Sequence, residues 1–274
     1  GVMQRLGLDY QTLSEINPRL IYCSITGYGQ TGGYQNKAGH DINYVALSGI
    51  AGHSGRQHSG PPPMGIQIAD IAGGSLHSVI GILAAVIERQ RSGLGQYIDI
   101  SMTDCVVGLS SMAAAASLAG QEKQGPEQSY LNGATFYDYY ETQDGRYLSI
   151  GSLEPQFLHG LAQILELPIV AEKGASLATE DRQVVKQAIK DKIKTQDFAT
   201  WNAIFQQQDV CVEPVLKLDE ALDSQLAKDR AWVISVPLKE GSTKSEQQLA
   251  CPIKFSRSKI RYEFIGKPLG FDSL

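Results

Sequence analysis

A run of 17 apolar and small residues, from Ile71 to Ile87, constrains the fold of this chain more than any other feature. A membrane-spanning helix needs about 20 consecutive apolar residues, and this run is shorter and includes three glycines, two serines and a histidine. A buried helix is therefore favoured over a membrane span. Charged residues and then Ser92-Gly93 follow the run, which predicts that the helix ends at about Arg91.

Extended and helical patterns alternate around this helix. Leu20 to Ile25 is typical of a buried strand, and Tyr97 to Ile100 alternates as a second strand. The other expected elements are a short helix over His40 to Ile50, an extended segment over Met64 to Ile68 and a buried helix over Met102 to Leu118. Alternation of this kind predicts an α/β domain whose parallel sheet is covered by helices.

A polar stretch from Ala119 to Tyr130 indicates a linker to a second, smaller α+β domain. Beyond it, two strand-like segments flank Gln143-Asp144-Gly145, which predicts a hairpin. The strands are expected over Phe136 to Tyr140 and Tyr147 to Ile150, and helices over Pro155 to Leu165, Glu180 to Lys194 and Phe198 to Gln207. We therefore predict a large α/β domain over 1–118, a linker over 119–135, the small domain over 136–225, and a linker that returns to the large domain over 226–274.

Charge and cysteine usage exclude several classes of protein. The net charge of −5 and the 19% of charged residues argue against a nucleic-acid binder, which would carry a clustered basic excess. The four cysteines include no C-x-x-C pair, so they fit neither a zinc site nor a disulfide framework. Because polar sequence follows Gly1-Val2-Met3-Gln4-Arg5, we expect no signal peptide. We expect a cytoplasmic protein with no metal and no membrane partner.

His40 follows a glycine at the expected start of a helix. At such a start, unpaired backbone N–H groups and the positive end of the helix dipole can stabilise an oxyanion. A capping or packed histidine is the commoner role of such a residue. The residue becomes a catalytic candidate only in combination with others.

Asp70 lies between apolar residues where the long helix begins. Its simplest role is that of a helix N-cap. Its apolar neighbours could also desolvate the carboxyl group and raise its pKa, while Gly73 and Gly74 could let a ligand approach the backbone closely. Capping and catalysis are compatible here.

Glu154 directly precedes Pro155, which suits the first position of a helix. It could cap that helix, or it could orient a histidine in an acid/base site. The sequence does not choose between the two. The glycine-rich loop from Gly27 to Gly33 fits neither the dinucleotide fingerprint nor the P-loop, so it is a weak signal for a phosphate site and a stronger one for close passage of a ligand.

Together these segments resemble the CoA-transferase family III (CaiB/BaiF) superfamily and, within it, the α-methylacyl-CoA racemase branch. The likeness runs from Gly1 to about Val215. The segments that carry it are Thr26-Gly27-Tyr28-Gly29-Gln30-Thr31-Gly32, Gly39-His40-Asp41-Ile42-Asn43-Tyr44, Ala69-Asp70-Ile71-Ala72-Gly73-Gly74, Gly95-Gln96, Asp144-Gly145-Arg146-Tyr147, Leu153-Glu154-Pro155-Gln156-Phe157 and Cys211-Val212-Glu213-Pro214-Val215.

The resemblance implies a racemase or epimerase of 2-methylacyl-CoA thioesters. His40 and Asp70 would be the two acid/base groups, and the N–H of Asp41 would stabilise the enolate oxygen. Glu154 would hydrogen-bond His40, and Gly39 and Tyr44 would contact the substrate together with Asp41. Coenzyme A would enter as part of the substrate, with no further cofactor. Two alternatives remain: a CoA transferase with Asp70 as nucleophile, and a CoA-binding protein without activity.

The resemblance also implies a homodimer of interlocked subunits, in which the glutamate comes from the small domain of the partner. Family members begin with a further strand and helix that help to bind the nucleotide of coenzyme A, and only Gly1-Val2 corresponds to the end of that segment here. The family's Gly-Glu-His near the C-terminus is missing from 265–270. We therefore expect this chain alone to bind coenzyme A poorly and to turn over slowly.

Overall fold

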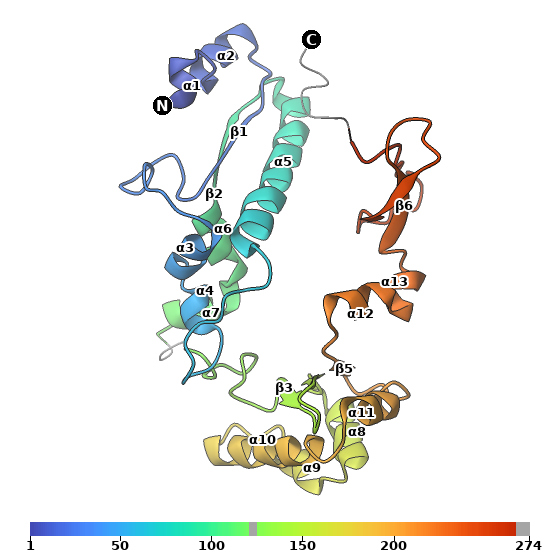
Figure 1. Cartoon of the computed structure of the whole chain (residues 1–274). Coiled ribbons are helices and arrows are strands. Elements are labelled where there is room, and N and C mark those ends of the chain that lie inside the picture. The colour runs from blue at the N-terminus through green and yellow to red at the C-terminus, as the bar shows by residue number, and fades with distance from the viewer. Residues whose placement is uncertain (121–124, 267–274) are drawn as a thin grey trace. The chain divides into compact units, whose positions relative to one another are not determined.

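The computed structural model describes residues 1–120 and 125–266, and the chain divides into two compact units, 1–213 and 214–274 (Figure 1). Both of the regions expected from the sequence, an α/β part and an α+β part, lie in the first unit. The predicted boundaries at 118, 135 and 225 stay a prediction. The residues 121–124 of the predicted linker, and 267–270 of the C-terminal segment compared with the family, lie outside the described residues.

Two parallel strands form the sheet of the α/β part. Strand β1 (Tyr22–Thr26) pairs with β2 (Tyr97–Ser101), with Tyr22 opposite Tyr97 and Thr26 opposite Ser101. Parallel strands require a crossover connection, and here it contains a π-helix, η1 (Ala69–Leu76), that continues into helix α5 (His77–Ser92). Helix α5 runs beside both strands in Figure 1. The predicted parallel sheet with a covering helix is confirmed.

Short helices complete this part of the chain. They are α1 (Val2–Arg5), α2 (Tyr10–Ile16), α3 (Asp41–Leu47), α4 (Ile50–His53), α6 (Met102–Leu109) and α7 (Ser111–Leu118).

Glycines allow close packing around the two strands. A Cβ on Gly81 of α5 would lie 3.3 Å from Ile98 Cγ2 in β2, and a Cβ on Gly95 would lie 1.9 Å from the backbone oxygen of Leu20. The second distance is far below any real contact, so only glycine fits at the turn into β2. The small residues of the predicted helix thus let the helix pack closely against the sheet.

The face of α5 that points away from the sheet is exposed. Val79, Ile80, Leu83 and Ile87 retain between 53% and 62% of their accessible surface. The prediction of a buried helix is therefore wrong for this chain, because the two strands cover only one side of it. The continuous helix Ala69–Ser92 is long and apolar enough to cross a membrane by length and composition alone. The absence of a membrane partner stays a prediction.

Two further expectations fail in this region. The helix predicted over Met102 to Leu118 is broken at Ser110, where the backbone leaves the helical region, and α7 has no buried residue. The segment from Met64 to Ile68 forms no strand: three prolines precede it, and Met64 and Ile66 are exposed.

The α+β part contains a three-stranded sheet in the order β3-β4-β5. Strands β3 (Asp138–Glu141) and β4 (Tyr147–Ile150) are antiparallel, and Gly145 in the turn between them has φ of +79°. The predicted hairpin is confirmed. The remaining elements are α8 (Pro155–Leu165), α9 (Pro168–Lys173), α10 (Thr179–Ile193), α11 (Phe198–Phe205) and β5 (Val212–Pro214).

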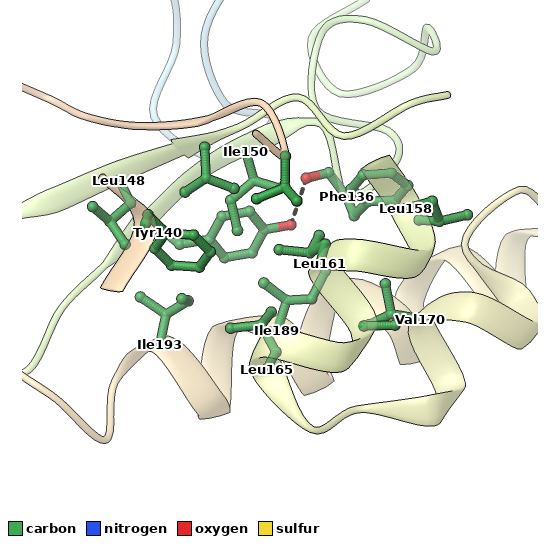
Figure 2. Close-up of a cluster of buried hydrophobic side chains, with 14 of the residues drawn as sticks. Phe136, Tyr140, Leu148, Ile150, Leu158, Leu161, Leu165, Val170, Ile189 and Ile193 are labelled. Carbon is green, nitrogen blue, oxygen red and sulfur yellow. Dashed lines mark hydrogen bonds between the residues drawn. The ribbon is translucent and has the colours of Figure 1, made fainter. Parts of the chain in front are cut away.

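Side chains from the strands and helices of this part meet in one apolar core. Figure 2 shows side chains such as Tyr140, Leu161 and Ile189 directed toward one another, with the Tyr140 hydroxyl donating a hydrogen bond to the Phe136 carbonyl at 2.7 Å. Burial raises the pKa of Tyr140 well above its usual value. The buried hydroxyl therefore stays neutral and keeps its hydrogen bond.

Replacing Leu161 by alanine is expected to lower the free energy of unfolding by about 2–4 kcal/mol, because its side chain is 0% exposed in this core. Leu177→Ala serves as the control, since Leu177 is 76% exposed and should change stability by less than about 0.5 kcal/mol. Urea unfolding followed by tryptophan fluorescence measures both. Equal midpoints for the two variants would contradict this packing.

The second unit contains two short helices followed by a hairpin. Helices α12 (Leu218–Asp223) and α13 (Gln225–Asp229) precede β6 (Val233–Pro237) and β7 (Ser245–Leu249), which are antiparallel. The sequence pattern did not predict these four elements.

Candidate active site

Helix α3 begins directly after His40, as predicted. His40 has extended backbone angles, φ −126° and ψ 173°, and its N–H donates to Asn43 Oδ1 at 3.0 Å. The helix is shorter than expected, because it ends at Leu47 and α4 begins after Gly49, whose φ is +87°. The side chain of His40 is exposed at this helix start.

The first N–H groups of α3 are unpaired. Within the part of the chain that the structure describes, neither the N–H of Asp41 nor that of Ile42 donates a hydrogen bond. These groups carry the positive end of the helix dipole and can bind a negatively charged oxygen. The geometry therefore allows the oxyanion role expected of the Asp41 N–H, which stays a prediction.

Tyr44 holds the backbone in front of His40. Its side chain is buried, and its hydroxyl donates a hydrogen bond to the carbonyl of Gly39. A Cβ on Gly27 or Gly39 would lie 2.3 or 2.7 Å from Tyr44 Cε1, so both positions must be glycine for the ring to fit. The glycines of these two motifs thus make room for Tyr44, while substrate contact by Gly39 and Tyr44 stays a prediction.

Asp70 lies in the first turn of η1, near the same tyrosine. Burial raises the pKa of Tyr44, and the charges of Tyr28 and Asp70 raise it further. A π-helix is rare and often marks a functional site. The side chain of Asp70 is exposed, as is that of His40, so neither points into a core.

The carboxylate of Asp41 links the two helix starts. Its Oδ2 accepts a hydrogen bond from the N–H of Ala69 at 2.6 Å and another from the N–H of Asp70 at 3.0 Å. The side chain that follows His40 therefore caps the helix that carries Asp70. The sequence had indicated only a backbone role for Asp41.

Three expectations about Asp70 need correction. It is not the N-cap of its helix, since Asp41 supplies the capping carboxylate. Its apolar neighbours do not bury it, because Ile68 packs into a separate cluster around Tyr44 and Ile71 is 49% exposed. A Cβ on Gly73 would lie 3.0 Å from the Met102 backbone oxygen, so this glycine serves packing on α6.

Gly74 is also a packing glycine. A Cβ there would lie 3.3 Å from Met102 Cγ and 3.4 Å from Ile25 Cγ2 in β1. The pair of glycines after Asp70 therefore brings η1 close to α6 and the sheet, and the expectation that the pair faces a ligand is wrong.

Glu154 lies at the start of a helix in the α+β part. It is the N-cap residue of α8, with Pro155 at the first helical position as predicted, and its side chain is exposed. Among the described residues it makes no hydrogen bond to His40. Burial raises the pKa of the neighbouring Cys211, and the Glu154 carboxylate raises it further. A role of Glu154 toward a histidine stays a prediction.

The described residues contain no group of three or more His, Cys, Asp or Glu side chains that could hold a metal ion. A site free of metal stays a prediction.

A carboxylate holds the glycine-rich loop in place. The Gln30 N–H donates a hydrogen bond to Asp99 Oδ2 at 2.9 Å, and the Tyr28 and Tyr34 rings meet edge to face.

Comparisons with known proteins agree with the resemblance seen in the sequence. The model of CoA-transferase family III matches residues 1–273. Over 237 residues the chain is 40% identical to α-methylacyl-CoA racemase of Mus musculus and 37% identical to that of Homo sapiens, covering 86% of this chain and 62% of each relative. Succinyl-CoA:glutarate CoA-transferase of Homo sapiens is 30% identical, over 78% of this chain and 50% of the relative.

Solved structures show the same fold. A CaiB/BaiF family protein from Brucella suis has a TM-score of 0.74 at 28% identity, covering 96% of this chain and 68% of that one. The chain spans 62% of the length of the racemases that it matches. Since the family model covers nearly every residue, the chain belongs to CoA-transferase family III.

Proposed function

We propose that this protein racemises or epimerises 2-methylacyl-CoA thioesters. The observation that carries the proposal is the pair of hydrogen bonds from Ala69 and Asp70 to the Asp41 carboxylate, which brings the His40 and Asp70 segments together with both side chains exposed. The identity of 37–40% to α-methylacyl-CoA racemases supports the substrate class.

The chemistry needs two groups on opposite faces of one carbon. One base removes the proton next to the thioester carbonyl, the electron pair moves onto the carbonyl oxygen as an enolate, and the other group returns a proton from the opposite face. His40 and Asp70 take these roles. The unpaired N–H of Asp41 donates to the enolate oxygen. No electrons are lost or gained overall, so coenzyme A as part of the substrate suffices.

Glu154 has a supporting role in this proposal. A carboxylate that accepts a hydrogen bond from an imidazole fixes its orientation and stabilises its protonated form. Because Glu154 and His40 share no hydrogen bond in the described chain, we assign this contact to an interlocked homodimer in which each site takes its glutamate from the partner.

A CoA transferase is the second candidate, favoured by the exposed carboxylate of Asp70 and by the 30% identity to succinyl-CoA:glutarate CoA-transferase. In that reaction the carboxylate attacks the thioester carbonyl and releases the CoA thiolate, leaving a mixed anhydride. The thiolate then attacks the aspartyl carbonyl, which forms an aspartyl thioester and frees the acid.

Incubation with a 2-methylacyl-CoA in deuterium oxide tests the proposal. Racemisation should place solvent deuterium on the α-carbon of the thioester without forming free acid. Hydroxylamine is the second arm, because it cleaves an aspartyl thioester and marks Asp70 as a hydroxamate detectable by mass spectrometry. Labelled Asp70 with no deuterium in the substrate would replace the racemase with the transferase.

A further inference from the structure

Four charged side chains form a cluster away from His40 and Asp70. Arg56 donates two hydrogen bonds to Asp138, each of 2.6 Å, in the bidentate geometry that a guanidinium and a carboxylate favour. Arg56 also reaches Glu127 at 3.0 Å, and Lys186 lies 2.7 Å from Asp138. The two positive and two negative side chains neutralise one another, so the cluster has no net charge with which to bind a charged ligand.

Asp138 is the centre of this cluster. Its side chain is only 7% exposed, and burial raises its pKa, but the hydrogen bonds from Arg56 and Lys186 outweigh burial and leave the pKa below its usual value. The pKa of Arg56 is raised, chiefly by its hydrogen bond to Asp138. A buried carboxylate of this kind depends strongly on its partners, because an unpaired buried charge is costly.

The cluster joins two parts of the first unit. Arg56 lies three residues after α4, which packs against α3, the helix that begins directly after His40. Asp138 begins β3 and Lys186 lies in α10, and both elements supply buried residues to the α+β core.

Two more hydrogen bonds join residues at the end of α4 and just after it to the segment that precedes β3. The Asn132 amide donates to the His53 carbonyl at 3.0 Å, and the Gln57 N–H donates to Glu127 at 3.1 Å. Beyond Gln57, residues 58–67 are all exposed as the chain runs to η1 and Asp70. Arg56 is the last partly buried residue before that exposed stretch.

We propose that Arg56 is a positioning residue for the racemase reaction proposed above, on which this inference rests. It fixes the α3–α4 pair, which follows His40 and includes Asp41, to the α+β core. The proton transfer depends on this tie although no member of the cluster touches the substrate. A displacement of about 1 Å at reacting groups can cost 10²-fold in rate, so loss of the tie acts on turnover more than on substrate binding.

Arg56→Met, Arg56→Lys and the control Lys173→Met test this inference in the full chain. The side chains of Lys173 and Arg56 are both 43% exposed, and Lys173 forms an ion pair with Asp181 that does not involve residues 53–57. We expect Arg56→Met to lower kcat for α-deuterium exchange by about 100-fold with KM changed by less than about threefold. Arg56→Lys should lower kcat about tenfold, because an ammonium group cannot form the bidentate pair of hydrogen bonds that a guanidinium forms. Lys173→Met should lower kcat by less than about twofold.

Amide hydrogen exchange gives a second readout that turnover does not affect. Exchange at residues 53–60 should accelerate in Arg56→Met and stay unchanged in Lys173→Met. Equal kcat for these two variants overturns the inference, whatever the amides show. If circular dichroism shows that Arg56→Met is unfolded, Arg56→Lys decides, and wild-type turnover for it overturns the inference. If the wild-type protein incorporates no deuterium into the substrate, the proposed racemase activity is refuted. Amide hydrogen exchange in Arg56→Met still tests whether Arg56 fixes residues 53–60.

Discussion

Replacing His40 by alanine is expected to slow α-proton exchange from one epimer of a 2-methylacyl-CoA far more than from the other, and Asp70→Asn is expected to do the reverse. In the proposed mechanism each group serves one face of the carbon, so each substitution should remove the base for one epimer and the acid for the other. General acid–base groups contribute about 10²–10⁴-fold, which sets the size of the loss for the affected epimer.

Each epimer is incubated separately in deuterium oxide, and label is followed by mass spectrometry before racemisation is complete. His58→Ala is the matched control, because His58 is an exposed histidine in the loop between α4 and η1 and should leave both rates unchanged. Equal losses from both epimers in either site variant would remove the two-base assignment. Unchanged exchange rates in both variants would show that His40 and Asp70 do not form the active site.

Local sequence signals predicted several elements correctly. The helix over Pro155 to Leu165 has the bounds of α8, because proline favours the first helical position and the apolar spacing follows one face. The hairpin around Gln143-Asp144-Gly145 follows equally from its turn residues. Such signals act over a few residues, so they can be read without knowledge of the rest of the chain.

Burial could not be predicted in the same way. The apolar run from Ile71 forms a helix, but its exposure depends on how many elements cover it, and here the two strands cover one side. Short helices such as α2 were missed because they carry little apolar periodicity. One local signal was available there: Asp9 accepts a hydrogen bond from the Thr12 N–H, as capping residues do.

The long-range contacts around the candidate site could not be predicted from the sequence pattern either. The Asp41 carboxylate and the N–H of Ala69 are 28 residues apart, and Arg56 and Asp138 are 82 residues apart. Both contacts depend on the fold rather than on spacing. The sequence identified the residues that suit the chemistry, and the structure adds the carboxylate that brings two of their segments together.

Removal of the Asp41 side chain is therefore expected to reduce turnover strongly, although its backbone N–H remains. In Asp41→Ala the N–H groups of Ala69 and Asp70 lose their acceptor, so the start of η1 is free to move relative to the start of α3. A shift of about 1 Å between two acid/base groups lowers kcat by about 10²-fold. Asp41→Asn should recover part of this loss, because its amide oxygen can accept both hydrogen bonds that Oδ2 accepts, although it lacks the charge that strengthens them.

Asp197→Ala separates this effect from the ordinary cost of losing a helix cap. The Asp197 carboxylate accepts a hydrogen bond from the Thr200 N–H at the start of α11, and among the described residues it forms no hydrogen bond or ion pair with His40 or Asp70. Both alanine variants should lower the free energy of unfolding by about 1 kcal/mol, the usual cost of a lost cap. Only Asp41→Ala should lower kcat for α-proton exchange. If Asp197→Ala reduced kcat as much, or if Asp41→Ala kept wild-type kcat at equal stability, the Asp41 carboxylate would have no positioning role.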